Sequence, residues 1–234
     1  YTRADGKSVT VLPEGAIYSY IDGDITFTWS PDSRWLAAVT GSIVRDSEIS
    51  LLDASGRLPP RNVSLGGFRE NDPQFTPDSQ ALYWSSERDG LRGADANGAQ
   101  SDVYIAHLTR ESWDAFRSTD DGPVPAAKAA AAWEPDLAGI RHRTVRLTPF
   151  SSRLAFSRVS ADGHKLVFAT LDDTMRLAGY RVDLRTRALQ PLFARPLTGT
   201  HIALDAAGEN LYLLGRGGIE RIHLADGTAS AVPF

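Results

Sequence analysis

Short stretches in which apolar and polar residues alternate, separated by polar turns, recur along the whole chain. Residues 8–12 (Ser-Val-Thr-Val-Leu) are an early example, and they follow the turn residues Asp5 and Gly6. Alternation over four to eight residues is typical of a half-buried β-strand. The pattern therefore predicts an all-β protein built from short strands.

One hairpin signature occurs four times. In each copy a strand ends in a polar residue, a turn follows, and a second strand begins with an apolar or aromatic run. Pro31 and Pro77 mark the first two copies and lie 46 residues apart, while Gly163 and Gly208 mark the last two and lie 45 apart. The four copies are residues 27–37, 74–84, 157–168 and 202–212.

The turn in this signature has a specific chemistry. A proline pre-sets φ for the turn, and the aspartate that follows can accept hydrogen bonds from nearby backbone. The next position suits a left-handed conformation, which glycine adopts freely. Ser33 and Ser79 occupy that position in the first two copies, at an expected strain of about 1 kcal/mol each.

Each copy is followed by a third strand and, after a polar turn, by a fourth. The predicted third strands are residues 48–52, 101–105, 177–182 and 219–222. Four antiparallel strands in about 45 residues make a β-propeller blade, and such a blade must stack against neighbours to bury both faces. A β-sandwich with similar turns is the alternative, but sandwiches seldom repeat one hairpin signature at one spacing.

The predicted fold is thus an all-β propeller of four-stranded antiparallel blades, with about four and a half blades present. The chain opens as if in mid-domain, so we expect an incomplete ring cut from a longer chain. The predicted blades are residues 1–13 (partial), 20–65, 72–148, 152–194 and 200–234. Trp29, Trp35 and Trp84 are predicted to lie in the core between blades.

An insertion over residues 88–138 interrupts the repeat. Residues 111–117 predict a short helix that places Trp113 and Phe116 on one face. Long insertions in propellers lie on the faces where partners bind, and a mobile surface loop is the other interpretation. The candidate partner- or substrate-binding residues of the insertion are Arg88, Arg92, Asp95, Asp102, Trp113 and Phe116.

Composition and charge exclude several classes of function. The net charge of −4 argues against a broad nucleic-acid-binding surface, which needs a basic stripe. No stretch approaches the roughly 18 apolar residues of a membrane span. The chain has no cysteine, which excludes disulfides, thiolate metal sites and a cysteine nucleophile.

No catalytic, cofactor or metal site is predicted. The chain lacks the Gly-x-Ser-x-Gly, phosphate-loop and His-Glu-x-x-His motifs. Asp95, Asn97 and Gly98 with Asp102 resemble part of a calcium loop, but the third early ligand and the closing glutamate are missing. The turn aspartates Asp32, Asp78 and Asp162 and the scattered histidines His107, His142, His164, His201 and His223 are expected to have structural roles.

A longer match points to a family. The Ser/Thr-Pro-Asp hairpin is shared by TolB-like and tricorn-like propellers. The chain resembles the second propeller of tricorn-like serine peptidases in a run from Gly66 to Asp78. The match continues in residues 85–92, 101–105, 109–116 and 136–148. The resembling branch is the bacterial one related to carboxy-terminal-processing peptidases. The departures from the family pattern are Ser33 and Ser79 in place of glycine, and Arg141 and His142 in place of acidic residues.

The resemblance implies a parent enzyme with an upstream propeller, this propeller, a PDZ domain and a catalytic domain. The catalytic residues of the family lie in the later domains, so none can be assigned here. In the family this propeller is thought to admit unfolded peptides to the proteolytic chamber. The implied partners are peptide or unfolded protein and other domains of the parent, with homo-oligomers formed through the parent.

Two other interpretations stay open. One is a TolB-like scaffold that docks a protein partner. The other is a propeller lyase or glycosidase, but the sequence offers no cluster of acid, base or metal residues for such chemistry. The resemblance favours a periplasmic location, with a cytoplasmic one as the alternative.

Overall fold

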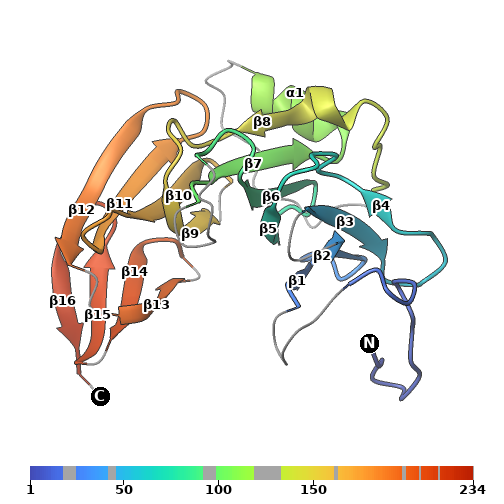
Figure 1. The fold of residues 1–234 in the computed structure, drawn as a ribbon, viewed down its shortest axis with the longest axis horizontal. Helices are drawn as coiled ribbons and strands as arrows, with labels where there is room; N and C mark the ends of the chain where they lie inside the picture. Colours follow the sequence, from blue (N-terminus) through green and yellow to red (C-terminus); the bar gives the residue numbers. More distant parts are fainter. Residues whose placement is uncertain are drawn as a thin grey trace. The chain divides into compact units, whose positions relative to one another are not determined.

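Four antiparallel sheets of four strands each make up most of the described chain (Figure 1). The computed structural model describes residues 1–17, 25–41, 46–91, 99–118, 133–160, 163–196, 199–205, 207–215 and 217–233. In every sheet the strands follow one another in sequence order, and each pairs antiparallel with the next. Each sheet is therefore a meander of the kind that forms one propeller blade.

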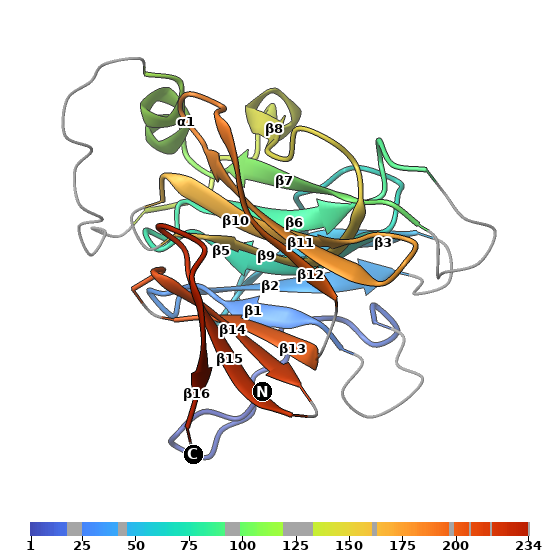
Figure 2. The same ribbon diagram turned by 90° about the vertical axis from the view of Figure 1, so that its left-hand side faces the viewer.

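The first two sheets take up the first part of the chain. The first sheet consists of β1 (Phe27–Trp29), β2 (Trp35–Gly41), β3 (Ser47–Asp53) and β4 (Arg61–Asn62). The second sheet consists of β5 (Glu70–Phe75), β6 (Ala81–Ser86), β7 (Asp102–His107) and β8 (Thr144–Arg146). The helix α1 (Arg110–Arg117) and the 3₁₀ helix η1 (Ile140–Arg143) lie between β7 and β8 in the sequence. Figure 2 shows β5, β6 and β7 side by side in that order, with α1 beyond β7.

The other two sheets take up the rest. The third sheet consists of β9 (Arg153–Val159), β10 (Lys165–Leu171), β11 (Arg176–Asp183) and β12 (Leu189–Pro196). The fourth consists of β13 (Gly199–Leu204), β14 (Asn210–Gly215), β15 (Gly218–His223) and β16 (Ala229–Val232). Among the described residues these sheets close no barrel, and the prediction of an incomplete β-propeller is confirmed.

The turns of the repeat have the predicted backbone. Ser33 and Ser79 have φ of 59° and 64°, and the corresponding Gly163 and Gly208 have 75° and 72°. In the first copy Asp32 Oδ1 accepts hydrogen bonds from the Ser30 hydroxyl (2.6 Å) and the Arg34 backbone N–H (3.2 Å). The turn aspartate therefore holds its own hairpin together, as predicted.

The second copy repeats the arrangement. Asp78 Oδ1 accepts from the Thr76 hydroxyl (2.6 Å) and the Gln80 N–H (3.0 Å). Asp162, the turn aspartate of the third copy, lies outside the described residues.

The chain divides into two compact units. One comprises residues 1–90 and 101–146, and the other comprises residues 91–100 and 147–234. The core of the first unit joins the first two sheets and includes Trp35, Ala37, Ile49, Leu51, Leu82, Trp84 and Tyr104. The core of the second unit joins the last two sheets and includes Val167, Ala169, Leu177, Leu211, Leu213 and Ile222.

The prediction of three core tryptophans is right for two of them. Trp35 and Trp84 are 2% and 1% exposed and belong to the core of the first unit. The prediction is wrong for Trp29, which is 38% exposed and meets Tyr1 edge to face, with ring centroids 5.1 Å apart. Trp29 pairs with Leu36 across the β1–β2 ladder and so lies on the face of the first sheet that is turned away from the second.

The N-terminal residues contribute a short hairpin. A single antiparallel bridge joins Thr2 to Ser8 around the turn at Gly6, where the sequence predicts the last two strands of a blade. Val11 and Leu12, which follow, pack on the outer face of the first sheet. No helix in the described part of the chain is long and apolar enough to cross a membrane.

Candidate functional site

Two ends of the second sheet carry its polar side chains. Because the strands are antiparallel, β5 and β7 begin where β6 and β8 end. We call this the charged end, formed by Glu70, Arg88, Asp89, Asp102, Tyr104 and Arg146 together with Glu48 of β3. The opposite end, where β7 leads into α1, we call the helix end.

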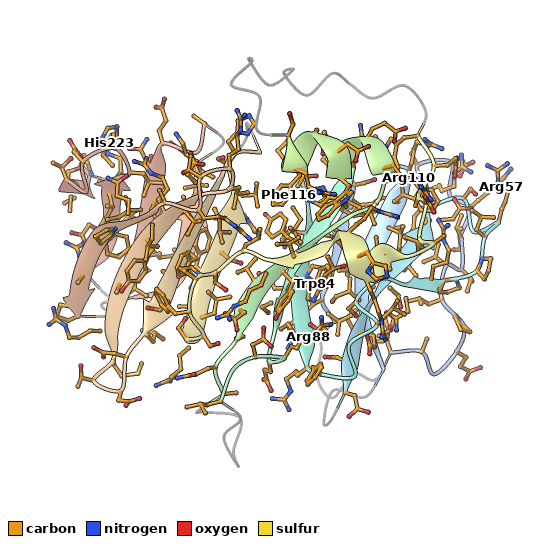
Figure 3. The ribbon with its side chains drawn as sticks, turned by 90° about the horizontal axis from the view of Figure 1, so that it is seen from above. Arg57, Trp84, Arg88, Arg110, Phe116 and His223 are labelled. Carbon is orange, nitrogen blue, oxygen red and sulfur yellow. The ribbon has the colours of Figure 1, made fainter. Side chains whose placement is uncertain are left out.

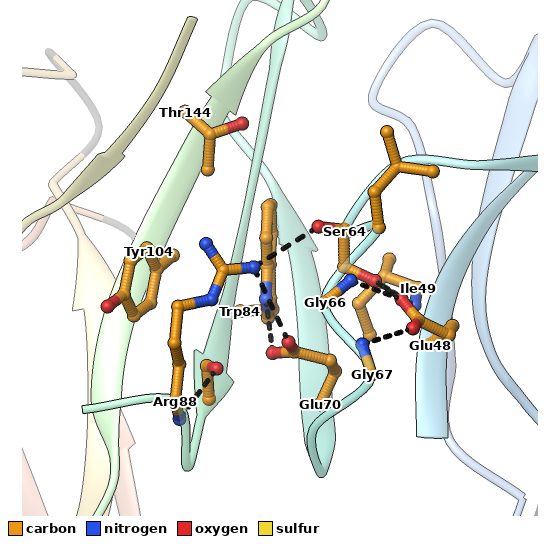
Figure 4. Close-up of polar contacts among 12 residues, drawn as sticks. Glu48, Ile49, Ser64, Gly66, Gly67, Glu70, Trp84, Arg88, Tyr104 and Thr144 are labelled. Atoms are coloured by element: carbon orange, nitrogen blue, oxygen red, sulfur yellow. Dashed lines mark hydrogen bonds and ion pairs between the residues drawn. The ribbon is translucent and has the colours of Figure 1, made fainter. Parts of the chain in front are cut away.

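Glu70 is a fully buried carboxylate at the charged end (Figure 4). Its side chain is 0% exposed, and Oε2 accepts a hydrogen bond from Trp84 Nε1 at 2.7 Å. Oε1 lies 4.0 Å from Nη2 of Arg88. Burial raises the pKa of Glu70 above its ordinary value, although hydrogen bonds from Ser86 and Trp84 and the charge of Arg88 act against that rise.

Arg88 spans the two sheets above this carboxylate. Nη2 donates to the Ser64 carbonyl at 3.3 Å, on the segment that follows β4. The guanidinium also lies over the rings of Tyr104 (5.0 Å) and Phe68 (5.6 Å), positions that favour cation–π attraction. Arg88 therefore helps to fix the first sheet against the second.

Glu48 is held by donors from the loop between the first two sheets. It accepts from the backbone N–H groups of Gly66 (3.0 Å) and Gly67 (2.6 Å) and from the Ser64 hydroxyl. Burial by itself would raise the pKa of Glu48, but these hydrogen bonds lower it below the ordinary value. A Cβ at Gly66 would lie 2.3 Å from Oε1 of Glu70, so any larger residue there would force the Glu70 side chain to shift.

Asp102 and Arg146 form the outer part of the charged end. Arg146 binds Oδ1 of the buried Asp102 through Nε at 3.0 Å and Nη2 at 2.8 Å. Its Nη1 lies 3.9 Å from Asp89, which accepts a hydrogen bond from the Tyr104 hydroxyl. Burial and the hydrogen bond to Asp89 raise the pKa of Tyr104.

The charged end thus consists of acidic groups that are held by neighbouring donors. No group of three or more histidine, aspartate or glutamate side chains within the described ranges is arranged to hold a metal ion. The described contacts of the charged-end groups join strands and sheets to one another.

The helix end is built around His107. Thr109 caps α1 by accepting from the Ser112 N–H at 3.1 Å, and the Ser112 hydroxyl meets His107 Nδ1 at 2.8 Å. Trp113 and Phe116 stack on each other, with centroids 6.1 Å apart, and the Phe116 ring lies 4.6 Å from the His107 ring. Burial lowers the pKa of His107 to about 4, so the ring is neutral at pH 7 and packs α1 onto the sheet.

The end of the insertion returns across both sheets. Trp133 is buried beside Trp35, with centroids 6.0 Å apart, and its Nε1 donates to Asp32 Oδ2 at 2.9 Å. Arg34 donates to the Trp133 carbonyl at 2.7 Å and pairs with Glu134 at 2.8 Å. The first sheet thereby anchors a segment inserted in the second.

Arg143 fixes the same segment from the other side. Its guanidinium donates to the backbone carbonyls of His107 (3.2 Å), Ala138 (3.0 Å) and Asp136. Arg143 is buried, and each of its three guanidinium nitrogens donates to a backbone carbonyl.

The sequence-predicted binding residues fall into two separate groups. Arg88 and Asp102 lie at the charged end, whereas Trp113 and Phe116 lie at the helix end, and Figure 3 shows Phe116 and Arg88 on opposite sides of Trp84. Arg92 and Asp95 lie outside the described residues. The described candidates therefore do not converge on one site.

Sequence reasoning missed the residues that complete these two ends. Glu48, Glu70, Arg146 and Trp133 all make buried or paired contacts. Their spacing in the sequence gives no sign of these contacts, because their partners come from other strands and other sheets.

The fold is shared with several known proteins. No protein-family model matches the chain, and no curated protein matches its sequence. Tricorn protease is similar over 88% of this chain and 22% of its own, with a TM-score of 0.60 and 17% identity. A puromycin hydrolase S511A mutant complexed with PGG is similar over 95% of this chain and 32% of its own, with a TM-score of 0.59 and 15% identity.

A putative TolB from Agrobacterium tumefaciens is similar over 88% of this chain and 64% of its own, with a TM-score of 0.56 and 13% identity. The chain has the β-propeller fold of these proteins. It spans less than two thirds of the length of each of them.

Proposed function

We propose that this chain is a non-catalytic β-propeller segment of a tricorn-like serine peptidase. It binds or gates peptide substrates for a proteolytic site in another domain. The observation that carries the proposal is the likeness of the four sheets to tricorn protease and to puromycin hydrolase. The engagement of the charged end's acidic groups in contacts between strands and sheets supports a structural role for this segment.

The helix end is the surface that we propose for peptide binding. Trp113 and Phe116 are only half-buried, and the guanidinium of Arg117 lies 5.5 Å from the centroid of the Trp113 ring. Aromatic rings next to exposed arginine suit the binding of extended polypeptide, because both can contact side chains and backbone without requiring a sequence. Arg88 and Asp102 serve the sheet contacts of the charged end, and Arg92 and Asp95 stay candidates for peptide binding.

A binding assay and a hydrolysis assay together test the proposal. The chain should bind a fluorescein-labelled, unfolded polypeptide such as reduced and alkylated α-lactalbumin, followed by anisotropy, without cleaving it. Trp113→Ala combined with Phe116→Ala should weaken binding at least tenfold. Met175→Ala, which removes an exposed apolar side chain elsewhere, is the matched control. Peptide turnover lost on changing a residue of this chain would refute the non-catalytic role.

A TolB-like scaffold for protein–protein interaction is the second candidate. Its support is the Agrobacterium TolB structure, of which this chain covers 64%, a larger share than of tricorn protease. A scaffold of this kind would prefer a folded partner, so binding of labelled native α-lactalbumin without binding of the labelled unfolded form would favour it. Both candidates are compatible with a periplasmic location, which we propose over the cytoplasm.

A further inference from the structure

The returning part of the insertion, residues 133–136, lies on the first sheet in the manner of a bound peptide. Trp133 is its anchor, because it is only 8% exposed and its ring lies 6.0 Å from the Trp35 ring, centroid to centroid. The indole N–H of Trp133 donates to Oδ2 of Asp32 at 2.9 Å. A buried aromatic ring whose polar tip is paired is a common anchor where one polypeptide segment binds another.

The backbone of the same segment is held by two arginines of the first sheet. Arg34 donates to the Trp133 carbonyl at 2.7 Å, and Nη1 of Arg61 donates to the Pro135 carbonyl at 3.4 Å. Hydrogen bonds to the main chain, combined with a side-chain anchor, are the means by which proteins recognise extended peptides. Residues 133–136 are thus bound as a peptide ligand would be, but by their own chain.

The surface that this segment contacts has more donors than the segment has acceptors. Nε and Nη2 of Arg61 and Nε1 of Trp35 are buried, and none of these three atoms has a hydrogen-bond partner among the described residues. They lie close together, because the Arg61 guanidinium is 5.2 Å from the centroid of the Trp35 ring. A buried donor without an acceptor costs free energy, and a charged donor costs more than a neutral one. Residues 133–136 therefore contact this surface without satisfying it.

The acidic side chains of the segment serve other partners. Oε1 of Glu134 accepts from Arg34 at 2.8 Å, and Oδ2 of Asp136 accepts from the first residue of α1 at 3.0 Å. Pro135 lies between these two acidic residues, and its side chain carries no acceptor. Because the Pro135 carbonyl already lies 3.4 Å from Arg61, a glutamate side chain at this position is long enough to reach the guanidinium.

We propose that Asp32, Arg34, Trp35 and Arg61, which we call the docking surface, bind an extended segment of another polypeptide in which glutamate follows tryptophan by two residues. Residues 133–136 occupy this surface in cis, with the tryptophan in place but with proline where the glutamate would pair with Arg61. A carboxylate can accept from two N–H groups of one guanidinium at once, which is the acceptor that the surface lacks. This site goes beyond the proposed function, because it shares no residue with the peptide-binding surface of the helix end.

Peptide binding to a variant whose own segment is weakened tests the proposal. Trp133→Ala removes the anchor of the cis segment. A fluorescein-labelled peptide, Ala-Trp-Glu-Glu-Asp-Leu, repeats residues 132–137 with glutamate in place of Pro135. It should bind Trp133→Ala at least tenfold more tightly than the parent chain, where the cis segment competes at an effective concentration of roughly millimolar. Fluorescence anisotropy measures both affinities.

A second peptide isolates the contact with Arg61. The glutamate peptide should bind Trp133→Ala at least tenfold more tightly than the natural sequence, Ala-Trp-Glu-Pro-Asp-Leu, because only the former adds a carboxylate for the guanidinium. Arg61→Met in the same background removes the unpaired donors and should reduce this preference to less than about twofold. Arg57→Met is the matched control, because it removes an exposed arginine between β3 and β4, and it should leave the preference intact.

Further measurements keep the test decisive if the far-UV spectrum shows that Trp133→Ala is unfolded. Trp133→Phe keeps an aromatic ring and loses the donor to Asp32, so it then takes the place of Trp133→Ala. The preference for glutamate is also measured on the parent chain at millimolar peptide, where it should persist. Trp113→Ala combined with Phe116→Ala should leave the affinity for the glutamate peptide unchanged, which separates the docking surface from the helix end.

Three results would overturn the proposal. The first is equal binding of the glutamate and proline peptides to the folded chain. The second is a preference for glutamate that survives Arg61→Met, which would place the carboxylate elsewhere on the molecule. The third is a concentration-dependent dimer of the parent chain that disappears in Trp133→Ala, because it would assign the docking surface to residues 133–136 of a second copy of this chain.

Discussion

At the scale of single residues, the carboxylates of the charged end differ in what holds them. Glu48 accepts from two backbone N–H groups and a hydroxyl, and its pKa is lowered. Glu70 has Trp84 as a close donor and Arg88 only at 4.0 Å, and its pKa is raised. The pKa values of these two carboxylates, which both lie next to Gly66, are thus shifted in opposite directions, so their ionisation changes the stability of the fold in opposite ways.

This contrast predicts opposite pH trends for Glu70→Gln and Glu48→Gln. A carboxyl whose pKa is raised on folding binds its proton more tightly in the folded state, so stability falls as pH rises from the unfolded pKa, near 4.3, to the folded one. Glu70→Gln should therefore gain stability relative to the parent chain as pH rises through this window, by about 1.4 kcal/mol for each pH unit of the window. Urea unfolding from about pH 2.5 to pH 8 covers this window and also the acidic window of a carboxyl whose pKa is lowered.

Glu48→Gln serves as the matched control. A lowered pKa contributes stability that is complete above the unfolded pKa and is lost as pH falls through the folded pKa. Glu48→Gln should thus be less stable than the parent at pH 7, and the gap should close on acidification. Parallel pH trends for the two variants would show that the two carboxylates share one environment, contrary to the contacts described.

The sequence could predict residues whose role depends on local backbone. Ser33 and Ser79 were placed in the left-handed region from the glycine at the same position in later copies, and both have positive φ. Glu70 could not be predicted in the same way, because its donor Trp84 and its ion-pair partner Arg88 lie 14 and 18 residues further along and approach it only when β5 and β6 pair. Turn chemistry is local, whereas the burial of a carboxylate is not.

At the scale of elements, the hairpins, the third strands and α1 follow from the sequence pattern. The error at Trp29 has a physical origin, because the same local pattern is buried at Phe75 and exposed at Trp29. Periodicity states which face a side chain takes but not whether another sheet covers that face. The anchoring of the returning insertion by Trp133 also escaped prediction, since its partners, Asp32 and Trp35, are about 100 residues away.

Trp133 should contribute much more to the free energy of unfolding than its exposed neighbour Glu134. Trp133→Ala removes a buried ring beside Trp35 and the donor to Asp32, and should lower the free energy of unfolding by about 3–5 kcal/mol. Glu134→Ala removes an ion pair with Arg34 at the surface, where such pairs contribute about 0–1 kcal/mol. Urea unfolding gives both values, and similar losses in the two variants would mean that Trp133 does not anchor the segment.

At the scale of the whole molecule, a period of about 45 residues was enough to predict stacked four-stranded sheets, because one sheet cannot bury both of its faces by itself. The period does not reveal how strongly successive sheets are coupled. The structure divides the chain into two compact units, each with its own apolar core. Separate cores permit separate unfolding, as in repeat proteins whose cooperativity breaks down.

Tryptophan fluorescence can follow one unit alone, because all five tryptophans lie in the first. They are Trp29, Trp35, Trp84, Trp113 and Trp133. Far-UV circular dichroism, in contrast, reports the strands of both units. A difference between the two signals on heating therefore reports independent unfolding of the second unit.

Leu82→Ala and Leu211→Ala make this test specific. Both leucines are fully buried and both lie three residues after the left-handed turn position, Leu82 after Ser79 and Leu211 after Gly208. Each substitution removes a core side chain at a cost of about 2–5 kcal/mol, enough to lower the midpoint of a unit of roughly 100 residues by about 10 °C. Leu211→Ala should introduce an early transition seen by circular dichroism and leave the fluorescence midpoint unchanged, whereas Leu82→Ala should lower the fluorescence midpoint. If Leu211→Ala shifts both signals together, the two cores unfold as one cooperative structure and the division into units has no thermodynamic counterpart.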